Sequence, residues 1–405
     1  MTSARFLQIH TLHSYSAALL NRDDSGLAKR IMYGGAMRTR VSSQCLKRHW
    51  RKAEEDPHAL LMIPGAQDAF RSRELVTLKV IDPLRGKFKP ATIEVLNDLF
   101  QKQVYGEKGA DKKSRQTLIL GAPELNWLAE QAAALAPSVQ EALPDTGEDA
   151  LDKKALAKAV KDTECVTKAW TANFKKNIEA LRERTELAAG LPSALFGRMV
   201  TSDPAANIDA PIHVAHALTV HEEETESDYF TAVDDLKRDE DDSGADTIQE
   251  TELTSGLFYG YIVVDVPGLV SNLTGCERHE WDKVDRAMAA SVVHNLIYLI
   301  AEVSPGAKLG STAPYGRAEM VLVEAGDRQP RSLSAAFRDP VAPSLPSALS
   351  AAKAHLETMD RLYETGEMRR ALHTWNEDLP GAPRGSLREI AEWAKAAVLN
   401  GKASP

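Results

Sequence analysis

The run LFYGYIVVDV at residues 257–266 is the strongest strand signal in this chain of 405 residues. It combines aromatic with β-branched side chains, which are the types that strands favour. RFLQIHTL at residues 5–12 predicts a second buried strand, and shorter strand candidates lie at residues 195–200, 212–220 and 320–323. Strands near the N-terminus must therefore pair with strands far later in the chain, which predicts an α+β core interrupted by a large insertion.

The insertion has helical spacing of its apolar residues. Such patterns cover residues 92–105, 123–136 and 151–189, and we assign residues 57–192 to a helical insertion. A long buried helix is predicted at residues 284–303, and Ser386 with Glu389 forms a capping box for a last helix that ends at Asn400 and Gly401. The predicted core then consists of residues 1–56, 193–221 and 255–405.

An acidic segment lies between the last two core segments, at residues 222–254. Residues 222–242 contain eleven Asp or Glu against Lys237 and Arg238, a balance equal to the net charge of −9 of the whole chain. Runs of like charge favour exposure to solvent. We therefore predict a protruding hairpin for this segment.

A basic segment balances it. KRIMYGGAMRTRVSSQCLKRHWRKA at residues 29–53 contains eight Lys or Arg and no Asp or Glu. Ser42 and Ser43 are suited to cap a helix over residues 44–53, although no capping box supports it. Gln44, Lys47, Arg48 and Arg51 fall on one side of that helix, and Leu46, His49, Trp50 and Ala53 fall on the other. Two interpretations stay open, a phosphate-binding helix start and a solvated basic face. The paired Gly34 and Gly35 before it allow another backbone to approach closely.

The chain has few features of an enzyme or of a secreted protein. Cys45, Cys165 and Cys276 are widely spaced, no basic region followed by an apolar run opens the chain, and no phosphate-binding loop or hydrolase motif occurs. His213, His216 and His221 are close in sequence, but strand geometry would point them to different faces, so we interpret them and His294 as core or hydrogen-bonded residues. We expect a cytoplasmic protein with no cofactor, no metal, no catalytic residue and no membrane partner.

Several short blocks occur in a characteristic order. They are LNRDD (20–24), GG (34–35), RVSSQxLKR (40–48), GRMxTS (197–202), AHAxTxH (215–221), FTAVDDL (230–236), SGxFY (255–259) and PGAK (305–308). This order resembles the CasC family, the backbone subunits of the type I-E CRISPR surveillance complex Cascade. The resemblance implies a hand-like fold, with an RRM-like (ferredoxin-type) palm, helical fingers at residues 57–192 and a thumb hairpin at residues 222–254.

The family also implies a function without catalysis. Copies of the subunit oligomerise along a CRISPR RNA, present it for pairing with target DNA, and flip bases at intervals with the thumb, together with other Cascade subunits. Carried over by position, the residues on the guide backbone are Arg22, Lys29, Ser42, Gln44, Lys47, Arg48 and Arg51. Met199 matches a wedge at the kink in the guide, and the thumb residues are Tyr229, Phe230, Thr231 and Val233, with Ile248 on the returning arm.

Two other functions are compatible with the same residues. Backbone subunits of type III CRISPR complexes cleave RNA with a loop aspartate, and Asp23 and Asp24 lie in a predicted loop. Without such chemistry, these residues would pair with an arginine or cap the loop. The other alternative is a general single-strand RNA-binding protein, which would bind RNA without assembling along it.

Overall fold

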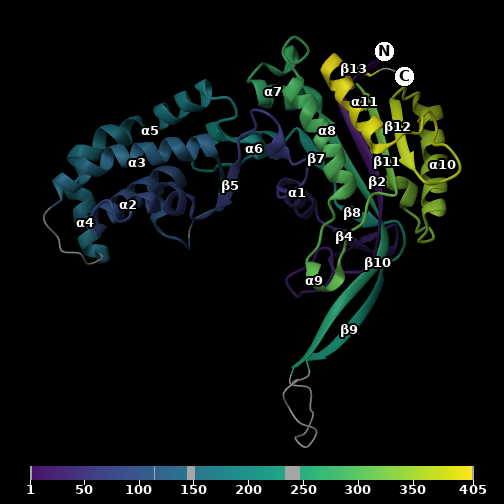
Figure 1. Cartoon of the computed structure of the whole chain (residues 1–405), viewed down its shortest axis with the longest axis horizontal. Coiled ribbons are helices and arrows are strands. Elements are labelled where there is room, and N and C mark those ends of the chain that lie inside the picture. The colour runs from purple at the N-terminus through teal and green to yellow at the C-terminus, as the bar shows by residue number, and fades with distance from the viewer. Residues whose placement is uncertain (1, 114, 144–150, 233–246, 404–405) are drawn as a thin grey trace, which may run out of the picture. The chain divides into compact units, whose positions relative to one another are not determined.

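A computed structural model describes residues 2–113, 115–143, 151–232 and 247–403 (Figure 1). The chain forms two compact units. The first comprises Met1–Ile63, Ile212–Pro267 and His279–Pro405, and the second comprises Pro64–Pro211 and Gly268–Arg278. The helical second unit begins at Pro64, seven residues after the position at which the sequence places the insertion.

A large antiparallel sheet forms the centre of the first unit. Its order is β12-β11-β2-β10-β8-β4-β3, and β7 and β9 also pair with β10. The strands are β2 (Phe6–Ala18), β3 (Arg30–Tyr33), β4 (Ala36–Val41), β7 (Ile212–Val214), β8 (Ala217–Thr219), β9 (Glu224–Ala232), β10 (Thr247–Asp265), β11 (Met320–Gly326) and β12 (Met368–His373). The predicted strand at residues 257–266 is thus the inner part of β10, which pairs with β2 from Asp265 opposite Phe6 to Thr254 opposite Ala18.

The order of elements in this unit is that of a ferredoxin-type core. Strand β2, helix α1 (Ser43–Arg51), strands β7, β8 and β10, helix α8 (Ala287–Glu302) and strand β11 follow one another as β-α-β-β-α-β. All pairs between these strands are antiparallel. The α+β class predicted from the sequence is therefore confirmed.

Helices cover the sheet. Helix α10 (Leu345–Tyr363) packs on Leu12, Tyr259 and Leu322, which lie on the neighbouring strands β2, β10 and β11 and point to the same face of the sheet. Helices α8 and α11 (Leu387–Asn400) pack against each other and lie across the sheet in Figure 1. The capping box of α11 is confirmed, because the Ser386 and Glu389 side chains each accept the other's backbone N–H, at 3.3 and 2.7 Å. The remaining elements are α9 (Leu309–Thr312), β1 (Thr2–Ser3) and β13 (Lys402–Ala403), and β1 pairs with β13.

The second unit is mainly helical. A core that includes Leu96, Phe100, Leu128, Phe174 and Ile178 joins its long helices. The elements are β5 (Ala69–Ser72), which pairs with β6 (Leu118–Gly121), a π-helical turn (Val76–Ile81), and helices α2 (Pro90–Tyr105), α3 (Ala122–Ala142), α4 (Lys153–Asp162), α5 (Glu164–Arg184) and α6 (Leu191–Phe196). Helix α7 (Val266–Thr274) begins in the first unit and ends in the second.

Three local predictions need correction. The strand predicted at residues 195–200 is wrong, because residues 191–196 form helix α6 between Gly190 and Gly197, both at positive φ. A short apolar run does not distinguish a strand from a buried helix. The helical pattern at residues 151–189 is divided at Thr163, whose hydroxyl donates to the carbonyls of Ala159 and Val160 at the end of α4. The strand predicted at residues 212–220 is interrupted between β7 and β8.

Candidate nucleic-acid interface

The start of α1 is fixed by side chains from three parts of the chain. Ser42 is the N-cap, and its hydroxyl accepts the N–H of Cys45 at 3.3 Å, as predicted. The Ser42 N–H donates to Oδ1 of Asn21 at 2.9 Å, and the Ser43 N–H donates to Nδ1 of His216 at 3.2 Å. Asn21 also accepts the Lys29 N–H through its carbonyl at 2.9 Å. The loop before the basic segment, strand β3 and the helix start are therefore held together.

Cations gather around this helix start. The pKa of His216 is lowered by partial burial and then by the positive charges of Arg40, Lys29 and Lys47. Burial raises the pKa of the Cys45 thiol, while the charges of Arg48 and Lys29 act in the opposite direction. Lys29, Arg40 and Lys47 therefore act on the start of α1, whereas Arg48, in the last turn of the helix, acts on Cys45. The N–H groups of Ser43 and Cys45 are already bonded to His216 and Ser42, so these cations, and not those N–H groups, favour an anion here.

The faces of α1 are as predicted at Gln44, Arg48 and Trp50, and they are less distinct at Leu46 and His49, which are half-buried. Trp50 is buried, with an exposed fraction of 3%, whereas Gln44 and Arg48 are exposed and Lys47 and Arg51 are half-buried. Arg22 is exposed on the adjoining loop, where its backbone bridges to Ala28. Of the residues predicted to bind the guide backbone, Arg22, Lys29, Gln44, Lys47, Arg48 and Arg51 are exposed or half-buried in this region of the first unit, from here on called the α1 surface. Ser42 is buried, with an exposed fraction of 5%, and serves as the helix cap.

Other cations of the basic segment serve the fold. Arg38 is fully buried and donates to the carbonyls of Thr219 and Phe337, each at 3.0 Å. Lys52 pairs with Glu54 at 2.7 Å. The count of eight basic residues therefore overstates the charge that faces a ligand.

Gly34 and Gly35 form the two-residue turn of the β3–β4 hairpin, both at positive φ. A Cβ on Gly34 would lie 1.6 Å from the backbone oxygen of Arg338, so the predicted close approach of another backbone is confirmed. Residues 38–40 form part of β4, which ends at Val41 just before the cap at Ser42.

The acidic hairpin is anchored beside the basic segment. Arg30 Nε donates to Glu223 at 2.7 Å, its Nη2 donates to Glu252, and Glu252 also accepts the Ala28 N–H at 2.8 Å. These two acids at the base of the β9–β10 hairpin thus pair with a cation of their own chain. Glu224, Glu226, Asp228 and Glu250 further along the hairpin are exposed, as expected.

The predicted thumb residues are partly described. Tyr229 and Phe230 are exposed on β9, with exposed fractions of 62% and 42%, and the Lys308 ammonium lies 5.8 Å from the Phe230 ring centre. Thr231 and Ile248 are backbone partners across the hairpin. Val233 lies outside the described residues. The strand pairing therefore brings Thr231 and Ile248 together as the sequence suggested.

Met199 belongs to the second unit, after α6. It is one of the most exposed apolar side chains among the described residues, with an exposed fraction of 73%. The backbone on both sides of Met199 is held in place. Arg198 forms a β-bridge with Ile208, and the Val200 N–H donates to Asn207 Oδ1 at 2.7 Å. A solvent-facing thioether on a fixed backbone is chemically suited to contact a base.

The loop aspartates differ in their roles. Oδ1 of Asp23 accepts the N–H groups of Ser25 and Leu27 at 2.9 and 3.1 Å, so Asp23 caps its loop as expected. Asp24 is exposed beside it. Among the described residues, no group of three or more His, Cys, Asp or Glu is arranged to hold a metal ion.

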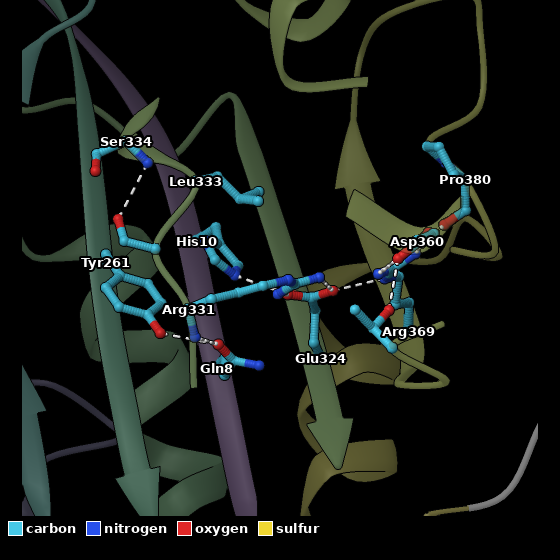
Figure 2. A network of polar contacts seen from close by, with 12 residues as sticks. Gln8, His10, Tyr261, Glu324, Arg331, Leu333, Ser334, Asp360, Arg369 and Pro380 are labelled. Atoms are coloured by element: carbon cyan, nitrogen blue, oxygen red, sulfur yellow. Dashed lines mark hydrogen bonds and ion pairs between the residues drawn. The ribbon is translucent and has the colours of Figure 1, made fainter. Parts of the chain in front are cut away.

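The most densely connected charged cluster is internal (Figure 2). Glu324 is fully buried on β11 and accepts from Arg331 at 2.7 and 3.0 Å, from Arg369 at 2.6 Å, and lies 3.0 Å from His10 Nε2. Arg369 also binds Asp360 through two contacts of 2.5 and 2.7 Å. Burial alone would raise the pKa of Glu324, but these partners hold it well below its ordinary value. Two carboxylates and two guanidinium groups therefore balance one another.

One face of the sheet is closed by contacts of its own aromatic residues. RRM domains stack bases on aromatic residues of their sheet. Here the Tyr259 hydroxyl accepts the Leu333 N–H at 2.9 Å. The Tyr261 hydroxyl donates to Gln8 at 2.8 Å, as Figure 2 shows. Tyr259 is buried, so these two aromatic side chains of β10 are engaged within the protein. The α1 surface, rather than this sheet face, is the candidate site for nucleic acid.

Sequence reasoning missed the supporting role of three residues, although it correctly interpreted His216 as hydrogen-bonded. Asn21 and His216 hold the start of α1, and Lys308 donates to Thr251 at 2.6 Å and so ties its loop to the hairpin. All three lie in the sequence blocks that carry the resemblance to the CasC family, and that position was the signal by which they could have been found. Their roles depend on contacts between distant segments, which spacing along the chain does not reveal.

The fold and the α1 surface define an α+β protein with a ferredoxin-type core and a candidate nucleic-acid interface. More particularly, residues 7–395 match the model of the CT1975-like proteins, Cas_CT1975, and the chain belongs to that family. No curated protein matches it.

Two solved structures have a similar fold. One is described as a CRISPR RNA-guided surveillance complex, pre-nicking, with a TM-score of 0.75 and 24% identity over 97% of this chain and 100% of that chain. The other is described as a CRISPR RNA-guided surveillance complex, with a TM-score of 0.64 and 22% identity over 97% of this chain and 99% of that chain. In the described part of the chain, no helix has the length and apolar character needed to cross a bilayer.

Proposed function

We propose that this protein is a non-catalytic CRISPR RNA-binding subunit of a type I-E Cascade complex. Several copies oligomerise along the guide RNA in the cytoplasm, and the guide then pairs with target DNA. Membership in a Cas family and the fold shared with chains of CRISPR RNA-guided surveillance complexes support this proposal. The other Cascade subunits are the remaining partners.

The arrangement of cations at the start of α1 carries the proposal. Lys29, Arg40 and Lys47 act on His216 at the capped start of α1 and Arg48 lies in its last turn, while the sheet face that RRM domains use is closed by Tyr259 and its partners. Contacts of this kind hold phosphates without reading bases. A guide-binding subunit needs this property, because the spacer sequence varies.

The β9–β10 hairpin supports the base-flipping role. Tyr229 and Phe230 present exposed aromatic surface, and Arg30 holds the base of the hairpin through Glu223 and Glu252. A wedge separates stacked bases by occupying their place, which apolar side chains do at little cost in desolvation. Replacing Tyr229 and Phe230 with Ser should leave assembly on the guide intact and weaken target binding. Wild-type target affinity in that variant would contradict the wedge.

The phosphate contacts are tested by reversing charge. Lys47→Glu with Arg48→Glu should abolish RNA-dependent assembly, or reduce the slope of log affinity against log salt by about 1.4 for two lost phosphate contacts. The matched control is Arg388→Glu with Lys395→Glu on α11, which changes the net charge equally away from the α1 surface. Equal behaviour of the two double variants would reject the α1 surface as the RNA site.

The ribonuclease alternative is tested on the same material. Asp24 is exposed in the loop that adjoins the α1 surface, so a catalytic role there is sterically open. RNA incubated with the protein and Mg²⁺ should stay intact on a denaturing gel. Cleavage that Asp24→Ala removes would replace our proposal with an Asp-dependent ribonuclease of the type III kind.

A further inference from the structure

A hollow of about 290 Å³ lies in the second unit, a few residues from Met199. It is formed where the end of α2, the start of β6 and the turn after Met199 meet. Tyr105, Glu107, Gln116, Thr201 and Ser202 line it. Its volume is at the lower end of the range for small-molecule pockets, which suits one planar heterocycle rather than a larger ligand.

The walls of this hollow are held in place by hydrogen bonds. The Thr201 hydroxyl donates to Gln116 Oε1 at 2.8 Å, and the Ser202 hydroxyl donates to the Val104 carbonyl at 2.9 Å. The Tyr105 hydroxyl accepts the Leu75 N–H at 3.1 Å, which fixes the orientation of its ring. A ligand would therefore enter a largely preformed site, which reduces the entropic cost of binding.

The chemistry of the walls disfavours a phosphate. The described residues that line the hollow include no Lys or Arg, and Glu107 adds a negative charge. A carboxylate and an amide accept hydrogen bonds from the exocyclic amines of nucleobases. The half-buried Tyr105 ring, with the Arg115 guanidinium 5.7 Å from its centre, adds apolar surface to the wall. Neutral hydroxyl groups of Thr201 and Ser202 complete a wall that suits a base and not its backbone.

The hollow lies close to the exposed side chain of Met199. Thr201 follows Met199 by two residues, so their Cα atoms are at most about 7 Å apart. A nucleotide that the Met199 side chain displaces from a stack is thus within reach of the hollow. Unstacked bases gain free energy when an aromatic side chain and hydrogen-bonding groups receive them.

We propose that this hollow binds one unstacked nucleobase of the guide–target duplex in each subunit, next to Met199. The inference rests on the proposed function, since it requires the nucleic acid to pass the second unit at Met199. It adds a receiving site in the helical insertion to the thumb wedge. Bases with an exocyclic amine should be held best, because Glu107 and Gln116 can accept from it.

The test uses guide RNAs that carry 2-aminopurine at successive positions, assembled with the full-length protein. This probe fluoresces when unstacked and has an exocyclic amine. At one position in each subunit footprint, the probe should be bright and yet several-fold less accessible to acrylamide than in free RNA. Thr201→Leu, which fills the hollow, should leave the probe bright but restore its accessibility. Thr117→Leu is the matched control, since Thr117 is also exposed but does not line the hollow.

The outcomes separate the two proposals. Failure of the wild-type protein to assemble on RNA would overturn the proposed function, and this inference with it. Assembly without any bright, protected position would overturn only the inference. Equal protection in the Thr201→Leu and wild-type complexes would also overturn it, because the filled hollow could not then hold the base.

Discussion

The Ser43 backbone N–H donates to Nδ1 of His216 at 3.2 Å, so a residue between β7 and β8 fixes the start of α1. This bond requires an unprotonated Nδ1. The pKa of His216 is lowered by its partial burial and by Arg40, Lys29 and Lys47, which keeps the ring neutral near pH 7. The same cations to which we assign RNA binding thus maintain the hydrogen bond that fixes the start of α1.

Substitution of His216 tests this relationship. His216→Leu removes the acceptor, so the start of α1 is no longer held in place, and RNA binding should weaken several-fold. His216→Asn supplies a side-chain oxygen in its place and should retain most of the affinity. Titration of a fluorescent RNA with each variant measures the difference. Equal loss in both variants would show that the ring, and not its acceptor atom, matters.

The buried cluster around Glu324 makes a prediction about stability. Glu324→Leu leaves Arg331 and Arg369 without their shared carboxylate, which should reduce the free energy of unfolding by about 3–5 kcal/mol. Glu377→Leu removes an exposed partner of Lys353 and should cost less than about 1 kcal/mol. Urea unfolding followed by circular dichroism compares them. Similar midpoints for the two variants would contradict the structural role of the cluster.

The pH dependence of stability follows from buried histidines. Burial lowers the pKa of His10 and His373, and lowers the pKa of His13 to about 4. Below about pH 6.5 the unfolded chain therefore binds protons that the folded chain does not. The free energy of unfolding decreases as the pH is lowered. The melting temperature should decrease steadily from pH 7 to pH 5. A constant melting temperature over this range would show that these rings protonate without cost.

The glycine turn allows a sharper comparison. Gly35→Ala introduces a side chain at positive φ in open space and should cost about 1–2 kcal/mol. Gly34→Ala adds the same strain and also places Cβ against the Arg338 backbone, so its loss of stability should be clearly larger. Thermal unfolding of both variants decides this. An equal loss would mean that the contact with Arg338 yields easily.

Local signals explain what the sequence could predict. The cap at Ser42, the two faces of α1 and the strand within β10 depend on residues close together in the chain, and they were predicted correctly. Helix α6 was mistaken for a strand because its apolar run is short. The pairing of Arg30 with Glu252 and the acceptor role of His216 depend on long-range contacts, and no spacing rule contains them.

The most direct measurement of the central claim is light scattering of the purified protein with and without a matched CRISPR RNA in the presence of Mg²⁺, followed by a denaturing gel of the RNA. We predict discrete oligomers that form only with RNA, and RNA that remains intact. A monomer whose mass does not change on addition of RNA would contradict the proposed function, and RNA cut at regular intervals would contradict its non-catalytic character.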